Sequence, residues 1–263
     1  MFMQTLLPLI VAVGMGFAML LGIVVGRQFG LRHLAAGRKI DREGVGEVEG
    51  ALFALFGLLL AFTFAAAFDR YDERRMLLSE EASAIHTAYV RMDLLPEAAQ
   101  PTIRALFIPY VESRIDYFQV KEGELTISGN SLAESQQLQR EIWATTMAAL
   151  KDKGWPIAET QLITQALNQM VDISYKRAMI VKLHPPLIVF LLLIGVAVLC
   201  SLVAGYRMAH GPAMHWFHKL TFILVFCATV YVLIEVEYPR IGFIRMSGYD
   251  EMLLDLLDHM KKG

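Results

Sequence analysis

The sequence predicts an all-α membrane protein with four transmembrane helices and a helical domain, outside the lipid, between the second and third of them. Hydrophobic residues make up 56% of its 263 residues, above the roughly 45–50% of an average soluble protein. Four uncharged apolar runs have about the length that crosses a bilayer. Between the second and third runs, apolar residues recur at helical spacing.

The four spans follow from length and charge. A hydrocarbon core of about 30 Å requires roughly 20 apolar residues in a helix, and backbone groups in lipid must hydrogen-bond internally. The spans are predicted at Leu6–Gly26, Gly50–Phe68, Leu187–Tyr206 and Leu220–Ile234, the last extended by Trp216 and Val236. The first run is interpreted as a retained span, because it lacks the basic start and short apolar core of a signal peptide.

This arrangement predicts four regions: a transmembrane hairpin at 5–68, a helical domain at 69–183, a second hairpin at 184–237 and a tail helix at 238–263. In the domain, an apolar stripe continues the second span as one helix. Pro96, a Ser131/Glu134 capping box and Pro156 are expected to open three further helices. The stripe that continues the second span contains Leu78, Ala82, Ile85, Tyr89 and Met92. The stripe of the helix after Pro96 contains Ile103, Leu106, Phe107, Tyr110, Val111, Ile115 and Phe118, and that of the helix after Pro156 contains Ile163, Ala166, Leu167, Met170, Ile173 and Met179. Such a domain forms an elongated stalk with few buried layers, which favours oligomerisation.

Basic residues beside the spans indicate the orientation. The loops at 27–49 and 207–219, on one side, carry seven Lys or Arg residues. The two ends of the domain and the C-terminal tail together carry ten. This difference predicts that the domain and both termini are cytoplasmic.

Several functional classes are not supported. A net charge of -2 gives no general attraction for nucleic acid, so no nucleic-acid partner is expected. Cys200 and Cys227 both lie in apolar runs and show no disulfide or metal spacing. No phosphate-binding glycine loop or nucleophile motif is present, so we expect neither an enzyme nor a cofactor. His215 and His218 lack a metal-binding frame and are interpreted as solvated.

Two segments resemble the bestrophins. Residues 62–75, FTFAAAFDRYDERR, resemble the family's Y-D-R-Y-W-E-G-R segment after the second span. Residues 235–243, EVEYPRIGF, followed by YDEMLLD at 249–255, resemble the family's acidic Pro-Phe-Gly segment and its acidic-apolar helix. Asp72 replaces an aromatic residue, and Pro239-Arg240-Ile241-Gly242 replaces Pro-Phe-Gly. The chain is similar to the bacterial bestrophin-like membrane proteins over about residues 5 to 250.

The resemblance implies a homopentamer in the bacterial inner (cytoplasmic) membrane. It also implies a central ion pathway lined by the second spans, with chloride or another anion as the permeant ion and a cytosolic helical domain. The expected partners are copies of the same chain, the lipid bilayer and small ions.

The second span carries a candidate neck. Alignment of Arg70 with the family's arginine places Leu58 and Phe62 at the apolar neck positions, and Ala54 and Ala65 lie on the same helical stripe. A ring of such side chains can gate a pore by dewetting. The alternative is that Phe62 packs between helices.

Charged residues follow both the second and fourth spans. Asp69, Arg70, Glu73 and Arg74 are candidate pore-mouth charges, which can alternatively serve as interfacial anchors or form salt bridges between subunits. After the fourth span the candidates are Glu235, Glu237, Pro239 and Gly242. The two glutamates are expected to pair with Arg70, Arg74 or Arg240, and one of them is expected to face solvent. The acidic tail is interpreted as a docking helix on Met252, Leu253, Leu256 and Leu257, without bound calcium or other metal.

The favoured function is an oligomeric bestrophin-like ion channel with an apolar neck on the second span. The alternative is a non-conducting membrane scaffold or sensor whose cytosolic helices bind a partner. A transporter is disfavoured because the spans show no internal repeat and no pair of interrupted helices.

Overall fold

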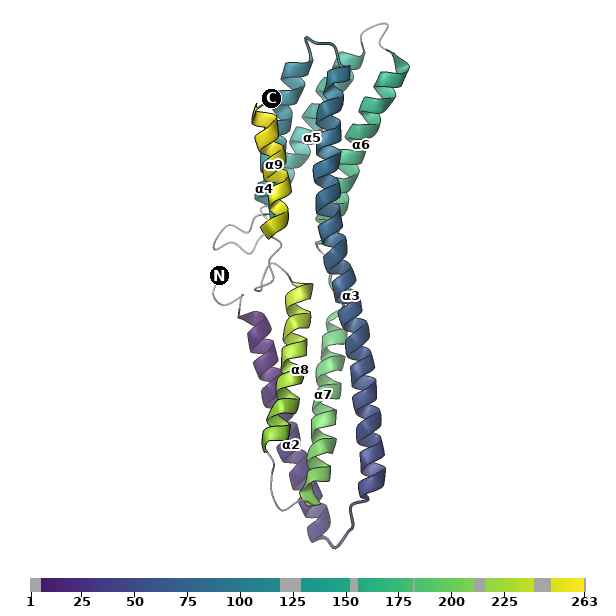
Figure 1. The fold of residues 1–263 in the computed structure, drawn as a ribbon, viewed down its shortest axis with the longest axis vertical. Helices are drawn as coiled ribbons and strands as arrows, with labels where there is room; N and C mark the ends of the chain where they lie inside the picture. Colours follow the sequence, from purple (N-terminus) through teal and green to yellow (C-terminus); the bar gives the residue numbers. More distant parts are fainter. Residues whose placement is uncertain are drawn as a thin grey trace. The chain divides into compact units, whose positions relative to one another are not determined.

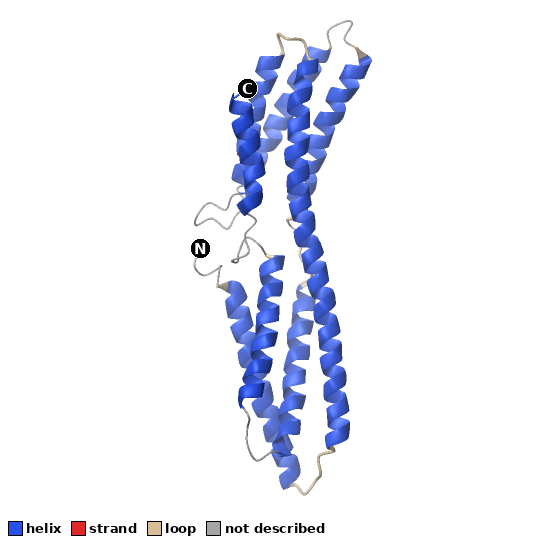
Figure 2. Cartoon of the chain, viewed as in Figure 1, coloured by secondary structure: helices blue, strands red, loops and turns tan. Residues whose placement is uncertain are grey.

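The computed structural model describes residues 6–118, 129–151, 156–181, 183–210, 216–238 and 247–262. Within these ranges the regular structure is entirely helical (Figure 2), as the sequence predicts. The chain divides into two compact units. We call residues 2–71 and 184–244 the span unit, and residues 72–183 and 245–263 the inserted unit.

The span unit contains the four predicted transmembrane helices, each long and apolar enough to cross a membrane. They are α2 (Leu7–Ala35), the first part of α3 (Arg42–Arg91), α7 (Leu187–Arg207) and α8 (Trp216–Glu237), with a short 3-10 turn, η2 (Met208–His210), after α7 (Figure 1). α2 and α3 extend beyond the predicted apolar runs. Flanking polar residues can continue a helix without contributing to a hydropathy signal.

Glycines bring α2 and α7 into close contact. A Cβ atom on Gly26 would lie 2.0 Å from the Leu202 carbonyl oxygen, and one on Gly205 would lie 2.2 Å from that of Ile23. Small residues allow helix backbones to approach closely in lipid, where association depends on packing. Gly26 and Gly205 therefore have a packing role between these two helices. Gly14 differs, since nothing lies within 4 Å of the Cβ position there.

In its described residues, the inserted unit contains the second part of α3 and five further elements (Figure 1). These are η1 (Met92–Leu94), α4 (Gln100–Phe118), α5 (Gly129–Leu150), α6 (Ile157–Ile180) and α9 (Ser247–Lys262). α6 starts directly after Pro156, as predicted. Pro96 does not open α4, because a turn intervenes, and Ser131 lies inside α5 instead of capping it.

Side chains from α3, α4, α5, α6 and α9 form the apolar core of this unit. Fully buried members include Ile85 of α3, Phe107 of α4, Ile163 of α6 and Leu253 of α9. Most of the predicted stripe positions are buried, but Met179 is 41% exposed. The tail helix docks on this core through Leu253, Leu256, Leu257 and Met260, while Met252 is exposed.

A buried ion cluster crosses the same unit. Arg114 Nε donates to Glu81 Oε1 at 2.6 Å, Arg177 Nη1 donates to Glu81 Oε2, and Arg114 Nη2 donates to the Ser174 carbonyl at 3.3 Å. Burial alone would raise the pKa of the Glu81 carboxyl, but the two guanidiniums hold that pKa below its ordinary value. Glu81 is therefore ionised, and it joins α3, α4 and α6.

Candidate functional site on the second span

The predicted neck stripe points away from the rest of its own chain. Leu58 is 53% exposed and Phe62 is 66% exposed, and Ala54 and Ala65 are also exposed. The opposite face of α3 packs on α8, where Phe56 stacks on Phe226 with ring centroids 4.4 Å apart. At about 100° per residue, the four stripe residues lie roughly 120–180° around the helix from Phe56. The stripe must therefore meet either lipid or another chain.

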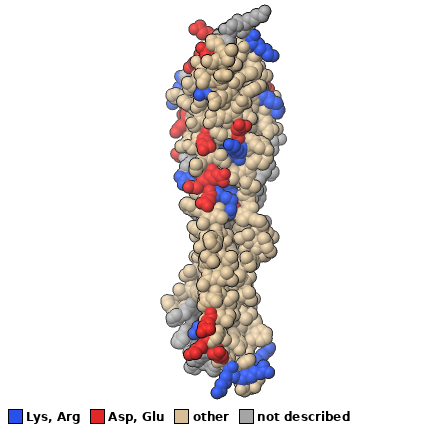
Figure 3. All heavy atoms as spheres, turned by 90° about the vertical axis from the view of Figure 1, so that its right-hand side faces the viewer, with Lys and Arg blue, Asp and Glu red and all other residues tan. Residues whose placement is uncertain are grey.

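α3 is also the span that its own chain covers least. Its most apolar stretch is 11% buried, against 33–39% for the corresponding stretches of the other three spans. Figure 3 looks onto the side of the molecule where α3 lies and shows a band without acidic or basic side chains. This band fits the absence of charge between Gly50 and Phe68.

The four predicted mouth charges divide into two pairs. Arg70 is half-buried and binds Glu237, with Nη2 to Oε2 at 2.6 Å and Nε to the same oxygen at 3.0 Å. Arg74 is buried and Nη2 donates to the Leu183 carbonyl at 3.1 Å. Asp69 and Glu73 are exposed. Their exposed carboxylates make the outward face of the helix acidic here.

The segment after the fourth span is more enclosed than the sequence predicts. Glu235 is 1% exposed and Glu237 is fully buried, so the expectation that one of them faces solvent is wrong. Side chains two residues apart on a helix point in different directions. Here the chain buries both glutamates, although they point to different sides of α8. His184 Nδ1 lies 3.5 Å from Glu237 Oε1, and its ring stacks on Tyr238. Pro239 and Gly242 lie outside the described residues.

Sequence reasoning did not identify the Glu81–Arg114–Arg177 cluster. A signal was present, because each of these charged residues occupies an apolar stripe position. Glu81 is three residues after Leu78, Arg114 is three after Val111, and Arg177 is four after Ile173. Charges at such positions are rarely buried unless paired, so three of them on three stripes predict an internal ion cluster.

Neither Cys200 nor Cys227 forms a disulfide. Among the described residues, no group of three or more His, Cys, Asp or Glu side chains is arranged to hold a metal ion.

The sequence matches a known protein family. The model of the Bestrophin-like domain family matches residues 18–248. The chain belongs to this family. The match includes part of the first span, the other three spans, both candidate segments and the first residues of α9. No curated protein matches the sequence significantly.

Solved structures show the same fold as this Bestrophin-like chain. Two single-substitution forms of a bacterial bestrophin homolog from Klebsiella pneumoniae align with TM-scores of 0.69 and 0.67 at 14% identity. The alignments cover 95% and 94% of this chain and 99% of each match. A structure described as a membrane protein aligns with a TM-score of 0.59 at 13% identity, covering 93% of this chain and 98% of the match. At these identities the likeness concerns the fold.

Proposed function

We propose that this Bestrophin-like protein is an oligomeric ion channel in which copies of α3 surround a shared axis. The observation that carries the proposal is the stripe of Ala54, Leu58, Phe62 and Ala65, which is apolar and uncovered by its own chain. Rings of such side chains constrict a water column and can gate it by dewetting. The family resemblance supports a homopentamer in the bacterial inner membrane, with the inserted unit and both termini in the cytoplasm.

The sign of the permeant ion is a separate question. The resemblance implies anions, but the exposed charges on α3 support cations. Asp69 and Glu73 are exposed, whereas the nearby arginines Arg70 and Arg74 donate hydrogen bonds inside their own chain. Rings of carboxylates at a pore favour cations. We therefore propose cation preference as the second candidate for selectivity.

Planar-bilayer recording of the purified protein tests the channel. Phe62→Ala should change the single-channel conductance or open probability, because it removes the largest side chain of the constriction. Phe17→Ala on α2 is the matched control: Phe17 is 65% exposed and Phe62 is 66% exposed, but Phe17 is not on the proposed pore helix.

Reversal potentials in asymmetric KCl give the sign: a shift toward the potassium equilibrium potential indicates cations, and a shift toward chloride indicates anions. Currents that are absent in the wild type, or equal effects of the two phenylalanine substitutions, would contradict the channel. Either result would favour the scaffold or sensor.

A further inference from the structure

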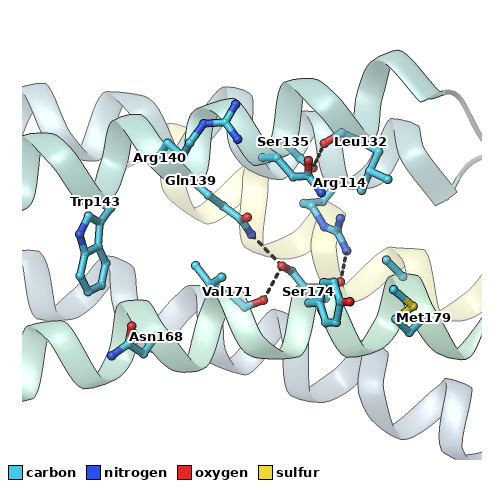
Figure 4. Close-up of a pocket in the computed structure, with 13 residues that line it drawn as sticks. Arg114, Leu132, Ser135, Gln139, Arg140, Trp143, Asn168, Val171, Ser174 and Met179 are labelled. Atoms are coloured by element: carbon cyan, nitrogen blue, oxygen red, sulfur yellow. Dashed lines mark hydrogen bonds between the residues drawn. The ribbon is translucent and has the colours of Figure 1, made fainter.

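The inserted unit contains a cavity that the proposed ion pathway does not use. Its volume is about 570 Å³, and it lies between α5 and α6 with Arg114 of α4 in its wall (Figure 4). Small-molecule sites typically have about 300–1,000 Å³, with apolar walls and a few placed polar groups. The cavity is therefore of a size that can hold a small organic molecule.

The charge of the cavity wall favours an anion. Arg114 and Arg140 both line it, and none of the lining residues in the described part of the chain is Asp or Glu. Arg114 is 1% exposed and is oriented by Glu81 and the Ser174 carbonyl. Glu81 is shared with a second guanidinium, that of Arg177. Arg140 is exposed at the cavity. Guanidinium groups bind carboxylates through charge-assisted, often bidentate hydrogen bonds.

The remainder of the wall supplies an apolar surface and a fixed polar one. Trp143 lies toward one end of the cavity in Figure 4, and Arg114 lies toward the other. Between them the Gln139 amide donates to Ser174 Oγ at 2.7 Å and to Tyr110 Oη at 3.0 Å, so its position is set by the protein. Asn168 is exposed at the cavity and provides a polar rim.

We propose that this cavity binds a small organic monoanion, a carboxylate attached to a flat apolar body. The carboxylate lies toward the two arginines, and the apolar body lies against Trp143. The inference stands independently of ion conduction, since it rests on the walls of α4, α5 and α6 alone.

Binding of 2-naphthoate to the full-length protein in lipid nanodiscs tests this site, with 2-naphthalenemethanol as the uncharged probe. Equilibrium dialysis gives the affinity after subtraction of uptake by empty nanodiscs. The wild type should bind 2-naphthoate saturably, about tenfold or more tightly than the alcohol. Quenching of Trp143 fluorescence should follow the same titration, measured in a protein with Trp155 and Trp216 replaced by phenylalanine.

Two substitutions probe the cavity without disturbing the buried ion cluster. Asn168→Trp fills the cavity and should weaken 2-naphthoate binding about tenfold or more. Arg140→Gln should weaken 2-naphthoate binding several-fold and leave the alcohol unaffected. The matched controls are Gln169→Trp and Lys176→Gln, because both residues are exposed on α6 but do not line the cavity.

Three results would overturn the proposal. One is no saturable binding by the wild type, and another is equal affinity for the two probes. The third is binding that Asn168→Trp leaves unchanged. If the wild type binds neither probe and Asn168→Trp alters the oligomeric state, the cavity instead accepts a side chain from a neighbouring copy.

Discussion

The two parts of α3 have very different surroundings in one continuous helix. Between residues 43 and 71 only Phe56 and Ala67 are buried, whereas seven residues between 72 and 91 are buried. In the inserted unit the helix contributes to an apolar core and an ion cluster. In the span unit its apolar surface is left for lipid or for other chains. An exposed apolar face on a long helix thus indicates an interaction beyond the single chain.

Of the changes considered, removal of the Glu81 carboxylate should have the largest effect, a loss of stability of the inserted unit. Glu81→Ala leaves two buried guanidiniums without their shared anion, and breaking a buried pair costs about 3–5 kcal/mol. The free energy of unfolding of the inserted unit, measured by denaturant titration of the full protein, should fall by that order. Glu80→Ala is the matched control on the exposed side of the same helix. Equal losses from the two substitutions would show that the cluster has no special role.

Disruption of the packing of α2 against α7 should cause the next largest loss of stability. Gly26→Leu places side-chain atoms where the Leu202 backbone lies, so the helices must separate. Overpacking costs about 1–3 kcal/mol. We expect a loss near the upper end of this range, because the added side chain meets backbone atoms, which cannot move as easily as a side chain. The thermal midpoint in detergent should drop for Gly26→Leu and stay unchanged for Gly14→Leu, which enters open space. A comparable drop in both variants would refute the close helix contact.

Acid should weaken the inserted part of α3. The pKa of Glu81 is lowered from its ordinary value of 4.5, because the two guanidiniums outweigh the effect of burial. The stabilisation is therefore complete above pH 4.5 and is lost as the pH falls through the lower pKa of the folded state. The thermal midpoint of the wild type should decline below about pH 4.5. In Glu81→Gln this decline should be smaller, and identical curves would show that other groups cause it.

Neutralisation of Asp69, the exposed acid at the end of the second span, should have the smallest effect, a change in ion selectivity. Asp69→Asn removes one carboxylate per subunit from the stripe that continues Phe62 and Ala65, so the permeability to cations relative to anions should decrease. The reversal potential in asymmetric KCl should move toward the chloride equilibrium potential. Glu80→Gln, on an exposed part of α3 farther along the helix, serves as the control. A shift away from chloride would contradict an acidic mouth.

The sequence was sufficient to predict the helical fold and its membrane spans. Uncharged runs of bilayer length have few physical alternatives, and α7 begins and ends within one residue of the predicted span. The continuity of α3 was also predictable, because neither glycine nor proline occurs between Leu58 and Leu95. The start of α4 was not, since Pro96 is equally compatible with the turn that precedes Gln100.

The candidate site was predictable in composition but not in its contacts. The stripe on α3 followed from helical spacing, and the sequence already offered Arg70 as a partner for a glutamate after the fourth span. The burial of both Glu235 and Glu237 did not follow, because burial depends on what surrounds a helix end and not on its own periodicity. The cavity beside Arg114 depends on the separation of α5 and α6, which no local pattern encodes.

Cysteine cross-linking between subunits tests most directly whether α3 meets its own copies. The protein would carry a single cysteine, Leu58→Cys or Phe17→Cys, with Cys200 and Cys227 replaced by alanine. Leu58 and Phe17 are 53% and 65% exposed in the single chain. In membranes treated with bismaleimides, Leu58→Cys should form covalent dimers and Phe17→Cys should remain monomeric. No dimers from Leu58→Cys, or dimers from both variants in equal yield, would contradict a shared axis along α3.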